Sequence, residues 1–223
     1  MKGPAPFSSR RDAGRKLAAR FVGKNSGEPV ILALPRGGVP VAYEVAKALH
    51  APLDLLMVRK IGAEGWQEYG LGAVIDGDGP HLVLNEGIVR ELAPNPNYIR
   101  AEMRRQLKEI KRRRLIYLGE RKPLGLTDRN IIVVDDGIAT GGTMRAALEC
   151  VRKQGPRHIT MAVPVAPPST LNELAVLCDD MICLVSPANF GAVGNFYRDF
   201  RQTADSEIIR LMAELEQETA SET

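Results

Sequence analysis

The sequence predicts an α/β fold in which a parallel β-sheet is flanked by helices on both faces. The first observation is a set of short apolar runs. They lack the alternation of polar and apolar residues that is typical of a strand with one solvent-exposed face. The second is that stretches with helical spacing separate these runs. The third is a chain of 223 residues that is 44% hydrophobic, enough for one core with an embellishment. We expect strands at residues 30–35, 53–58, 131–134, 159–165 and 181–186.

Helices are expected where apolar residues recur three and four positions apart. The last of them lies near the end of the chain, with Asp205 or Ser206 as its cap, and should pack on the body of the domain. The expected helices cover residues 39–49, 143–154, 169–177 and 205–216.

The alternation of strand and helix breaks between residues 61 and 129, which we interpret as an insertion. A glycine-rich start is followed by a short helix candidate and by a long helix over residues 97–118 with one apolar stripe. The stripe consists of Ile99, Met103, Leu107 and Ile110. Residues 100–122 contain ten Lys and Arg but three Glu. We favour a solvated helix docked by its stripe, with attraction of phosphorylated ligands or RNA as the alternative.

Composition and charge limit the class of protein. A formal net charge of +3 is too balanced to indicate a nucleic-acid or membrane partner. The three cysteines are odd in number and show no CxxC spacing, so we expect reduced thiols and a cytoplasmic protein. No segment approaches the apolar length of a membrane helix, and the first residues do not resemble a secretory signal. We expect a single domain over residues 1–223.

The segment IIVVDDGIATGGT, residues 131–143, carries the clearest chemical signal. Its strand should deliver Asp135 and Asp136 to the carboxyl edge of the sheet, where open α/β sheets place their ligands. The glycines that follow let the loop turn tightly and expose its amide groups. Thr140 and Thr143 add hydroxyl donors, and the next helix turns its positive end toward the loop. This combination predicts an anion-binding loop beside two carboxylates.

Adjacent acids beside such a loop suit a phosphorylated sugar. Vicinal sugar hydroxyls donate hydrogen bonds to carboxylates and can share a divalent cation with them, while the loop takes the phosphate. A Walker loop is excluded because no lysine stands in the required place, and a dinucleotide fold because no GxGxxG follows the first strand. A phosphoacceptor receiver domain would need a third acid and a lysine at strand ends, which are not apparent.

VVDDGIATGGT resembles, nearly residue for residue, the signature with which type I phosphoribosyltransferases bind phosphoribosyl diphosphate (PRPP). The resemblance implies that Asp135 and Asp136 contact the ribose 2- and 3-hydroxyls. It also implies that the following loop binds the 5-phosphate. That loop comprises Gly137, Ala139, Thr140, Gly141, Gly142 and Thr143. RKIGAEGWQEYGLGAV and NFYRDFRQT further resemble a largely uncharacterised bacterial subgroup of this family, so the resemblance covers most of the chain.

Two more segments follow expected strands and place positive charge at the same edge. LPRGGVP resembles the pyrophosphate loop of these enzymes, in which the amides of Gly37 and Gly38 and the Arg36 side chain would hold diphosphate. VRKIG ends the second expected strand with Arg59 and Lys60. A preorganised cation aimed at the charge developing on diphosphate is worth about 3–4 kcal/mol. We expect Lys60 before Arg59 in this role, with solvated charges as the alternative for both. Our catalytic candidates are Lys60, Arg36, Asp135 and Asp136.

The resemblance also implies Mg²⁺, a closing loop and a hood. Mg²⁺ would bind through PRPP and waters near Asp135 and Asp136, and we assign no direct protein ligand. Residues 61–80 occupy the position of the flexible loop that closes over the site in these enzymes. Residues 187–223 would form a C-terminal hood or helix, whose aromatic residues either stack on a flat acceptor or pack as core. These are Phe190, Phe196, Tyr197 and Phe200.

One departure from the family pattern concerns the acceptor. Family members that act on 6-oxopurines carry an acid at the position of Ala139, where it meets the N7 atom of the base. Alanine cannot accept that proton, which disfavours hypoxanthine and guanine. Adenine, orotate, uracil and acceptors that are not nucleobases stay open, and no general base is identified.

We therefore expect a Mg²⁺-dependent transferase that moves the 5-phosphoribosyl group of PRPP to a nitrogen nucleophile of a small-molecule acceptor and releases diphosphate. No membrane or nucleic-acid partner is expected, and a homodimer fits the habit of the family. The alternative is a regulatory protein that keeps the PRPP site as a sensor and binds RNA or a protein partner through its basic helix. Arg36 and Lys60 favour catalysis.

Overall fold

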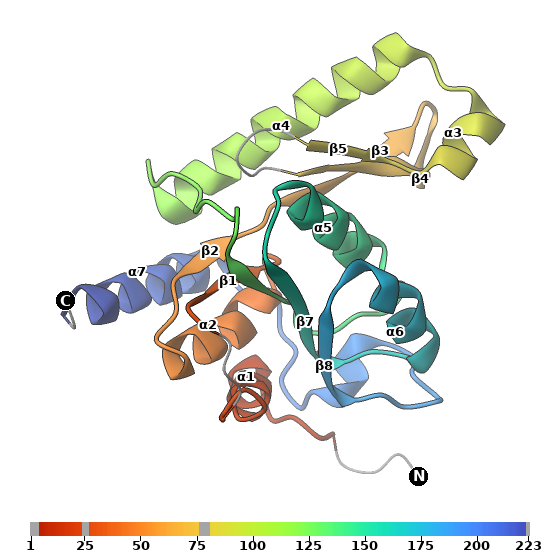
Figure 1. Ribbon diagram of the computed structural model, residues 1–223. Helices are drawn as coiled ribbons and strands as arrows, with labels where there is room; N and C mark the ends of the chain where they lie inside the picture. The colour runs from red at the N-terminus through yellow and green to blue at the C-terminus, as the bar shows by residue number, and fades with distance from the viewer. Residues whose placement is uncertain (1–4, 24–26, 76–80, 222–223) are drawn as a thin grey trace.

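A five-stranded parallel sheet forms the centre of the molecule (Figure 1). The computed structural model describes residues 5–23, 27–75 and 81–221. The strand order is β2-β1-β6-β7-β8, and every neighbouring pair is parallel. The strands are β1 (Pro29–Ala33), β2 (Leu53–Leu55), β6 (Asn130–Val134), β7 (His158–Val165) and β8 (Asp180–Val185). The predicted α/β fold class is confirmed.

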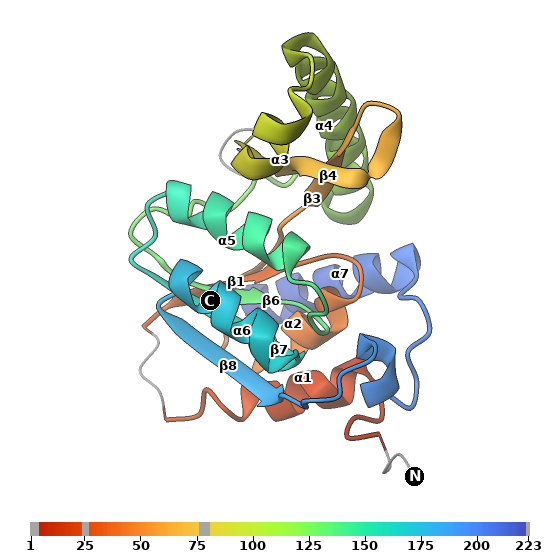
Figure 2. The ribbon, with the colours of Figure 1, turned by 90° about the vertical axis from the view of Figure 1, so that its right-hand side faces the viewer.

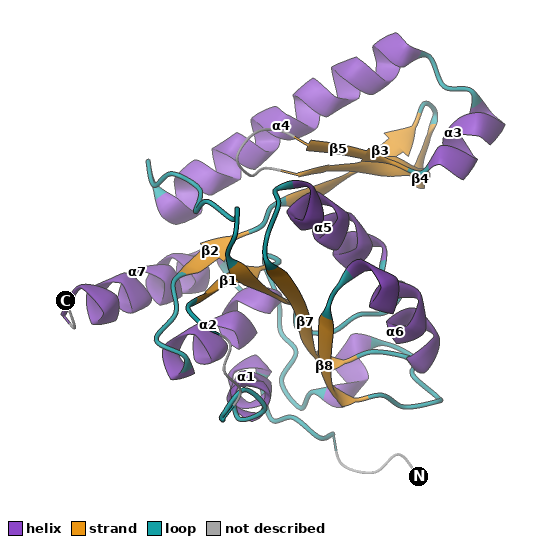
Figure 3. Ribbon diagram, in the orientation of Figure 1, coloured by secondary structure: helices purple, strands orange, loops and turns teal. Residues whose placement is uncertain are grey.

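Helices cover both faces of this sheet (Figure 3). One face carries α1 (Arg10–Ala18), α2 (Gly38–Ala48) and α7 (Asp205–Ser221), and the other carries α5 (Gly142–Lys153), α6 (Pro168–Leu174) and the 3-10 helix η1 (Ala175–Leu177). Successive strand residues point to opposite faces. In β6, Ile131 and Val133 pack on the α5 side, whereas Ile132 and Val134 pack on the α2 side. Burial on both faces explains the unbroken apolar runs.

Between β2 and β6 the chain leaves the central sheet and builds a small antiparallel one. Its order is β3-β4-β5, formed by β3 (Val58–Ala63), β4 (Trp66–Ile75) and β5 (His81–Leu84). The helices α3 (Glu86–Leu92) and α4 (Pro96–Leu118) follow. In the turned view the small sheet lies between α4 and α5 (Figure 2). The excursion expected from the broken alternation is therefore an ordered unit of strands and helices.

The strand expected over residues 53–58 is wrong in its boundary. β2 ends at Leu55 and β3 begins at Val58, since the apolar run continues through the point where the chain changes sheets. Arg59 and Lys60 consequently lie inside β3 and do not end a strand of the central sheet.

The glycine-rich stretch expected as a loop over residues 61–80 is instead a β-hairpin as far as Ile75. Residues 76–80 lie outside the described part of the chain. Gly72 shows why glycines occur in a strand here. A Cβ atom at Gly72 would lie 2.1 Å from the carbonyl oxygen of Val83 on β5, so only glycine permits this close approach.

A buried ion pair fastens α4 to the central sheet. Arg114 Nη2 donates to both carboxylate oxygens of Asp54, at 2.9 and 3.0 Å, and Arg114 Nη1 donates to the Leu55 carbonyl at 3.2 Å. The backbone N–H of Leu124 also donates to Asp54, at 2.9 Å. Arg114 is 8% and Asp54 is 3% exposed, so neither charge can turn to water if its partner is removed.

Arg114→Met should therefore lower the free energy of unfolding strongly. It leaves the Asp54 carboxylate buried without a cation, and breaking a buried pair costs about 3–5 kcal/mol. Urea denaturation measures the loss. Arg112→Met is the matched control on the same helix, because the Arg112 side chain is 58% exposed and solvent screens its pair with Glu109, so this substitution should cost far less. Equal losses in the two variants would contradict this account.

The ends of the chain pack on the central unit. The sequence pattern did not predict α1, although Ser9 caps it and the buried Ala13 and Leu17 lie four positions apart. A 3-10 helix, η2 (Val193–Phe196), precedes α7. The predicted cap is wrong, because Asp205 and Ser206 lie in the first turn of α7 and not before it. None of the helices within the described ranges is long and apolar enough to cross a bilayer.

Candidate functional site

The candidate site lies at the carboxyl ends of β1 and β6, a position that we call the crevice. The chain proceeds from β1 to β2 on one side and from β6 to β7 on the other, so the strand order reverses between them. Open α/β sheets bind their ligands in crevices at such reversals. The two glycine-rich loops identified from the sequence, residues 34–38 and 135–143, both leave the sheet at this point.

The two loops are in direct contact. A Cβ atom at Gly37 would lie 2.0 Å from Oδ2 of Asp136, and one at Gly38 would lie 3.0 Å from Cα of Asp135. The strands beneath are tied by the Leu34 backbone N–H, which donates to the Val134 carbonyl at 2.9 Å. The structure thus brings the predicted acids together with two glycines of the predicted diphosphate loop.

The loop before α5 presents an open helix end. Gly141 has a φ of +77°, a left-handed conformation that favours glycine, and a Cβ atom there would lie 2.8 Å from Cγ2 of Thr170. The Thr170 hydroxyl donates to the Ala139 carbonyl at 2.9 Å and fixes the loop. In the described chain no side chain caps α5, and its first turn contains no acid. Its first N–H groups are therefore available to an anion. Thr140 and Gly142 beside them are exposed.

The environment of the acid pair opposes two negative charges. Burial raises the pKa of both carboxyl groups, and the charge of Asp136 raises the pKa of Asp135 further. Arg10 acts in the opposite direction, since its Nε donates to Asp136 Oδ2 at 2.7 Å. The backbone N–H of Asp136 donates to Asp135 Oδ1 at 2.8 Å. A ligand that donates hydrogen bonds to both carboxylates would favour their ionised form.

The two cations of β3 are separated by the strand. Arg59 and Lys60 are neighbours, so their side chains leave opposite faces of the small sheet. Lys60 is exposed and lines, with Gly142 and Thr143, a groove of about 520 Å³ between the small sheet and α5. Arg59 faces α4, where its Nε donates to Gln106 at 2.9 Å. The structure therefore brings Lys60 to the start of α5 and does not bring Arg59 there.

Arg36 follows β1, but its guanidinium does not contact the acid pair. Arg36 Nη1 lies 3.6 Å from Oδ1 of Asp205 at the start of α7, and the same oxygen accepts from the Tyr117 hydroxyl at 2.7 Å. The Arg36 side chain is 33% exposed, so a diphosphate group in solvent can reach it.

The aromatic residues of the C-terminal segment pack on one another. Tyr197 and Phe200 are stacked with their ring centroids 5.0 Å apart, and Tyr197 also contacts Phe7 at 5.3 Å. Phe190 and Phe196 form a tilted pair at 5.3 Å. The Tyr197 hydroxyl donates to the carbonyl of Asp136. This arrangement favours the packing interpretation of these rings over a stacking surface for an acceptor.

Arg10 is a part of the site that sequence reasoning missed. It lies 126 residues from Asp136 in the chain and reaches that acid because α1 packs beside the crevice. Ser9 as a helix cap and the basic pair Arg10 and Arg11 were readable signals of an exposed helix start. Nothing in that pattern indicates a contact with an acid at the end of β6.

The crevice offers hard oxygen donors without a complete metal site. Among the described residues, no three His, Cys, Asp or Glu side chains gather into a ligand set. One oxygen of Asp136 is already bonded to Arg10, which leaves Asp135 and the other Asp136 oxygen. Mg²⁺ prefers oxygen ligands and retains several waters or phosphate oxygens. The residues fit a Mg²⁺ ion that takes most of its ligands from a phosphorylated substrate and water.

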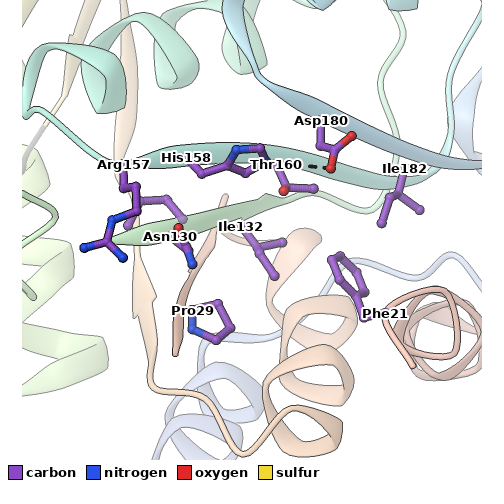
Figure 4. Close-up of a pocket in the computed structure, with 10 residues that line it drawn as sticks. Phe21, Pro29, Asn130, Ile132, Arg157, His158, Thr160, Asp180 and Ile182 are labelled. Atoms are coloured by element: carbon purple, nitrogen blue, oxygen red, sulfur yellow. Dashed lines mark ion pairs between the residues drawn. The ribbon is translucent and has the colours of Figure 1, made fainter. Parts of the chain in front are cut away.

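A separate cavity of about 330 Å³ lies at the opposite, amino-terminal edge of the sheet (Figure 4). Its lining includes the first residues of four strands, and His158 Nε2 lies 3.7 Å from Asp180 Oδ2. These first residues are Pro29, Asn130, His158 and Asp180. It contains none of the predicted site residues, and it lies away from the edge at which parallel sheets place ligands.

Comparison with known proteins agrees with this geometry. A family model described as "Phosphoribosyl transferase domain" matches residues 9–201. The chain belongs to the type I phosphoribosyltransferase family. The range matched by the phosphoribosyltransferase model contains both crevice loops, the antiparallel unit and Arg10.

Individual relatives of this phosphoribosyltransferase chain extend the comparison. A Mycobacterium tuberculosis (strain H37Rv) protein named as a phosphoribosyl transferase is 43% identical over 206 residues, which cover 92% of this chain and 46% of that protein. The chain thus spans about half the length of the curated relatives that it matches. The crystal structure of the Thermus thermophilus protein TT1426 has a TM-score of 0.82 and 39% identity, covering 94% of this chain and 98% of that one. A uracil phosphoribosyltransferase of Arthrobacter sp. (strain FB24) is 42% identical over 60 residues, 27% of this chain and 28% of that protein.

Proposed function

We propose that this chain transfers the 5-phosphoribosyl group of PRPP to a nitrogen atom of a small acceptor and releases diphosphate. The observation that carries the proposal is the contact between Gly37 and Asp136 at the switch point of the sheet. Through that contact, the acid pair, which suits sugar hydroxyls, adjoins the glycine loop, which suits diphosphate. The loop that carries the acids ends at the open start of α5. One PRPP molecule carries all three matching groups.

The chemistry follows from these positions. Asp135 and Asp136 accept hydrogen bonds from the ribose hydroxyls, and the amides at the start of α5 bind the 5-phosphate. The bond between C1 and diphosphate breaks with its electron pair going to diphosphate, and a bond forms between C1 and the acceptor nitrogen, which loses its proton to solvent or to a base not yet identified. Arg36 and Lys60 neutralise the charge that develops. Mg²⁺ bound with PRPP would supply further neutralisation of the leaving group.

The choice of acceptor is limited because the loop of residues 135–143 has no acid at Ala139. Ala139 is exposed at the position where an acid would meet N7 of a 6-oxopurine, and alanine offers no acceptor. The Arthrobacter relative is a uracil enzyme, but its match covers only 60 residues. We propose that the acceptor is not hypoxanthine or guanine, and that adenine, orotate, uracil and small amines are the first candidates.

A regulatory protein that senses PRPP and binds RNA through its basic helix remains the alternative function. Ion pairs within α4 reduce the support for this alternative. The cations of α4 meet acids of the same helix, Arg105 with Glu102 and Arg112 and Arg113 with Glu109. These pairs leave fewer cations for RNA phosphates. PRPP binding without diphosphate release, together with salt-dependent RNA binding, would favour the sensor.

Turnover is tested by incubating the protein with PRPP, Mg²⁺ and each candidate acceptor while diphosphate is measured. The proposal expects diphosphate release that depends on one acceptor, together with a stoichiometric amount of the phosphoribosylated acceptor. Hydrolysis of PRPP at one rate with every acceptor, or no release at all, would contradict a transferase. The cytoplasmic location and the homodimer stay predictions.

Lys60→Ala should reduce kcat about 100-fold, because it removes a cation aimed at developing negative charge. Arg59→Ala, on the opposite face of the same strand, should leave kcat within a few-fold, since Arg59 is bonded to Gln106. Lys108→Ala on the exposed face of α4 controls for the loss of one positive charge. A larger effect of Arg59→Ala than of Lys60→Ala would reverse the assignment of the two residues.

A further inference from the structure

Asp136 is fixed from three directions. Its Oδ2 accepts from Arg10 Nε at 2.7 Å, and the two side chains are only 12% and 13% exposed, with Arg10 the lower. Gly37 lies against the same oxygen so closely that a Cβ atom would come within 2.0 Å. The Tyr197 hydroxyl holds the backbone carbonyl of Asp136. Oδ2 is the Asp136 oxygen bonded to Arg10, which makes Oδ1 our candidate to accept a hydrogen bond from a ligand.

Arg10 is itself held before any ligand arrives. Its Nη1 donates to the carbonyl of Arg201 at 2.7 Å, and its guanidinium carbon lies 4.0 Å from the ring centroid of Phe200. Phe200 stacks on Tyr197, which bonds to Asp136. The backbone N–H of Asp12 donates to Ser9 Oγ at 3.2 Å and fixes the start of α1. The guanidinium is therefore preorganised, with Nε aimed at the acid and Nη1 aimed at the C-terminal segment.

We propose that Arg10 is a positioning residue for sugar binding, which orients the Asp136 carboxylate and offsets one of the two adjacent negative charges. This inference rests on the proposed function, because it takes Asp136 as an acceptor for a ribose hydroxyl. Arg10 acts through Asp136 and does not touch the reacting atoms. Arg10 also connects the acid pair to α1 and to the C-terminal segment. Neither of these two parts of the chain belongs to the loops that follow the carboxyl ends of the strands.

The test is the dissociation constant of PRPP, measured by calorimetry with Mg²⁺. Arg10→Gln should weaken binding about tenfold or more. Arg10→Lys keeps the charge and loses the planar guanidinium that bonds Asp136 and Arg201 together, so it should weaken binding less than Arg10→Gln. Arg11→Gln, the matched control, removes the next cation of α1, which pairs with Glu44, and should bind PRPP like wild type.

Three results would overturn the inference. Tighter PRPP binding by Arg10→Gln would make Arg10 a competitor of the sugar, and wild-type affinity in that variant would remove its positioning role. If a thermal melt shows that Arg10→Gln is unfolded, Arg10→Lys decides, and wild-type affinity in Arg10→Lys would refute a positioning role. Failure of the wild-type protein to bind PRPP would instead overturn the proposed function.

Discussion

Replacing Asp135 and Asp136 together by Asn should abolish measurable PRPP binding while the protein stays folded. Each carboxylate is expected to accept a hydrogen bond from a ribose hydroxyl, and a hydrogen bond to a charged group is worth about 1.5–3 kcal/mol. Losing two of them weakens affinity at least about 100-fold. Calorimetric titration with PRPP and Mg²⁺ measures the effect.

The direction in which this double substitution changes stability can be predicted. The folded-state pKa values of both acids are raised, so the stability contributed by the protonated pair is present below the ordinary carboxyl value of 3.8 and is lost as pH rises through the raised values. Asn resembles the protonated form and still offers Arg10 an acceptor. The melting temperature near neutral pH should therefore not fall below that of wild type.

The chain offers a matched control in its other adjacent acids, Asp179 and Asp180, which lie at the amino-terminal edge of the same sheet. The double Asn variant of that pair changes the net charge equally. It should bind PRPP like wild type. If both double variants lost affinity to the same extent, general charge would explain the effect and the sugar assignment would fail.

Gly37→Ala should weaken PRPP binding about 100-fold by displacing Asp136, a loss of the size expected when a charged hydrogen-bond acceptor is moved. Gly37 has φ −63° and ψ −35°, which alanine adopts readily, so the backbone is not strained by the change. The added Cβ atom would lie 2.0 Å from Oδ2 and 2.5 Å from Cγ of Asp136, and the carboxylate must move. Overpacking of this kind also costs about 1–3 kcal/mol of stability. Calorimetry and urea denaturation separate the two effects.

Gly125→Ala is the control, because nothing lies within 4 Å of a Cβ atom at Gly125. It should change neither the affinity for PRPP nor the midpoint of denaturation. Wild-type PRPP affinity in Gly37→Ala would show that the contact between the two loops is not needed for binding.

The central sheet could be predicted because each of its strands is buried on both faces. That burial produces unbroken apolar runs such as residues 131–134, which differ from the amphipathic helices between them. The same pattern could not predict that the chain changes sheets between β2 and β3. The run LDLLMV continues through it, and an apolar pattern does not report which sheet a residue joins.

The hairpin of β3 and β4 was mistaken for a loop because glycine usually marks turns. Gly72 is present for a different reason, the close approach of β5, and that reason lies in a partner strand. The alternation of side chains in β3 places Arg59 and Lys60 on opposite faces of the strand. Arg59 bonds to Gln106, whereas Lys60 lines the same groove as Thr143.

The two loops of the site could be predicted because each follows a strand of the central sheet, and parallel strands end at one edge. Their contact through Gly37 and Asp136 depends on strand order, which the sequence does not state. Arg10 could not be found for the same reason. It comes from a helix at the start of the chain and meets an acid 126 residues away.

The most direct test of the central claim is a calorimetric titration of the wild-type protein with PRPP and Mg²⁺. The account predicts saturable binding with one PRPP per chain, competed separately by diphosphate and by ribose 5-phosphate, because each fills part of the crevice between β1 and β6. Absence of saturable binding, or binding that neither fragment displaces, would contradict the assignment of this crevice as a PRPP site.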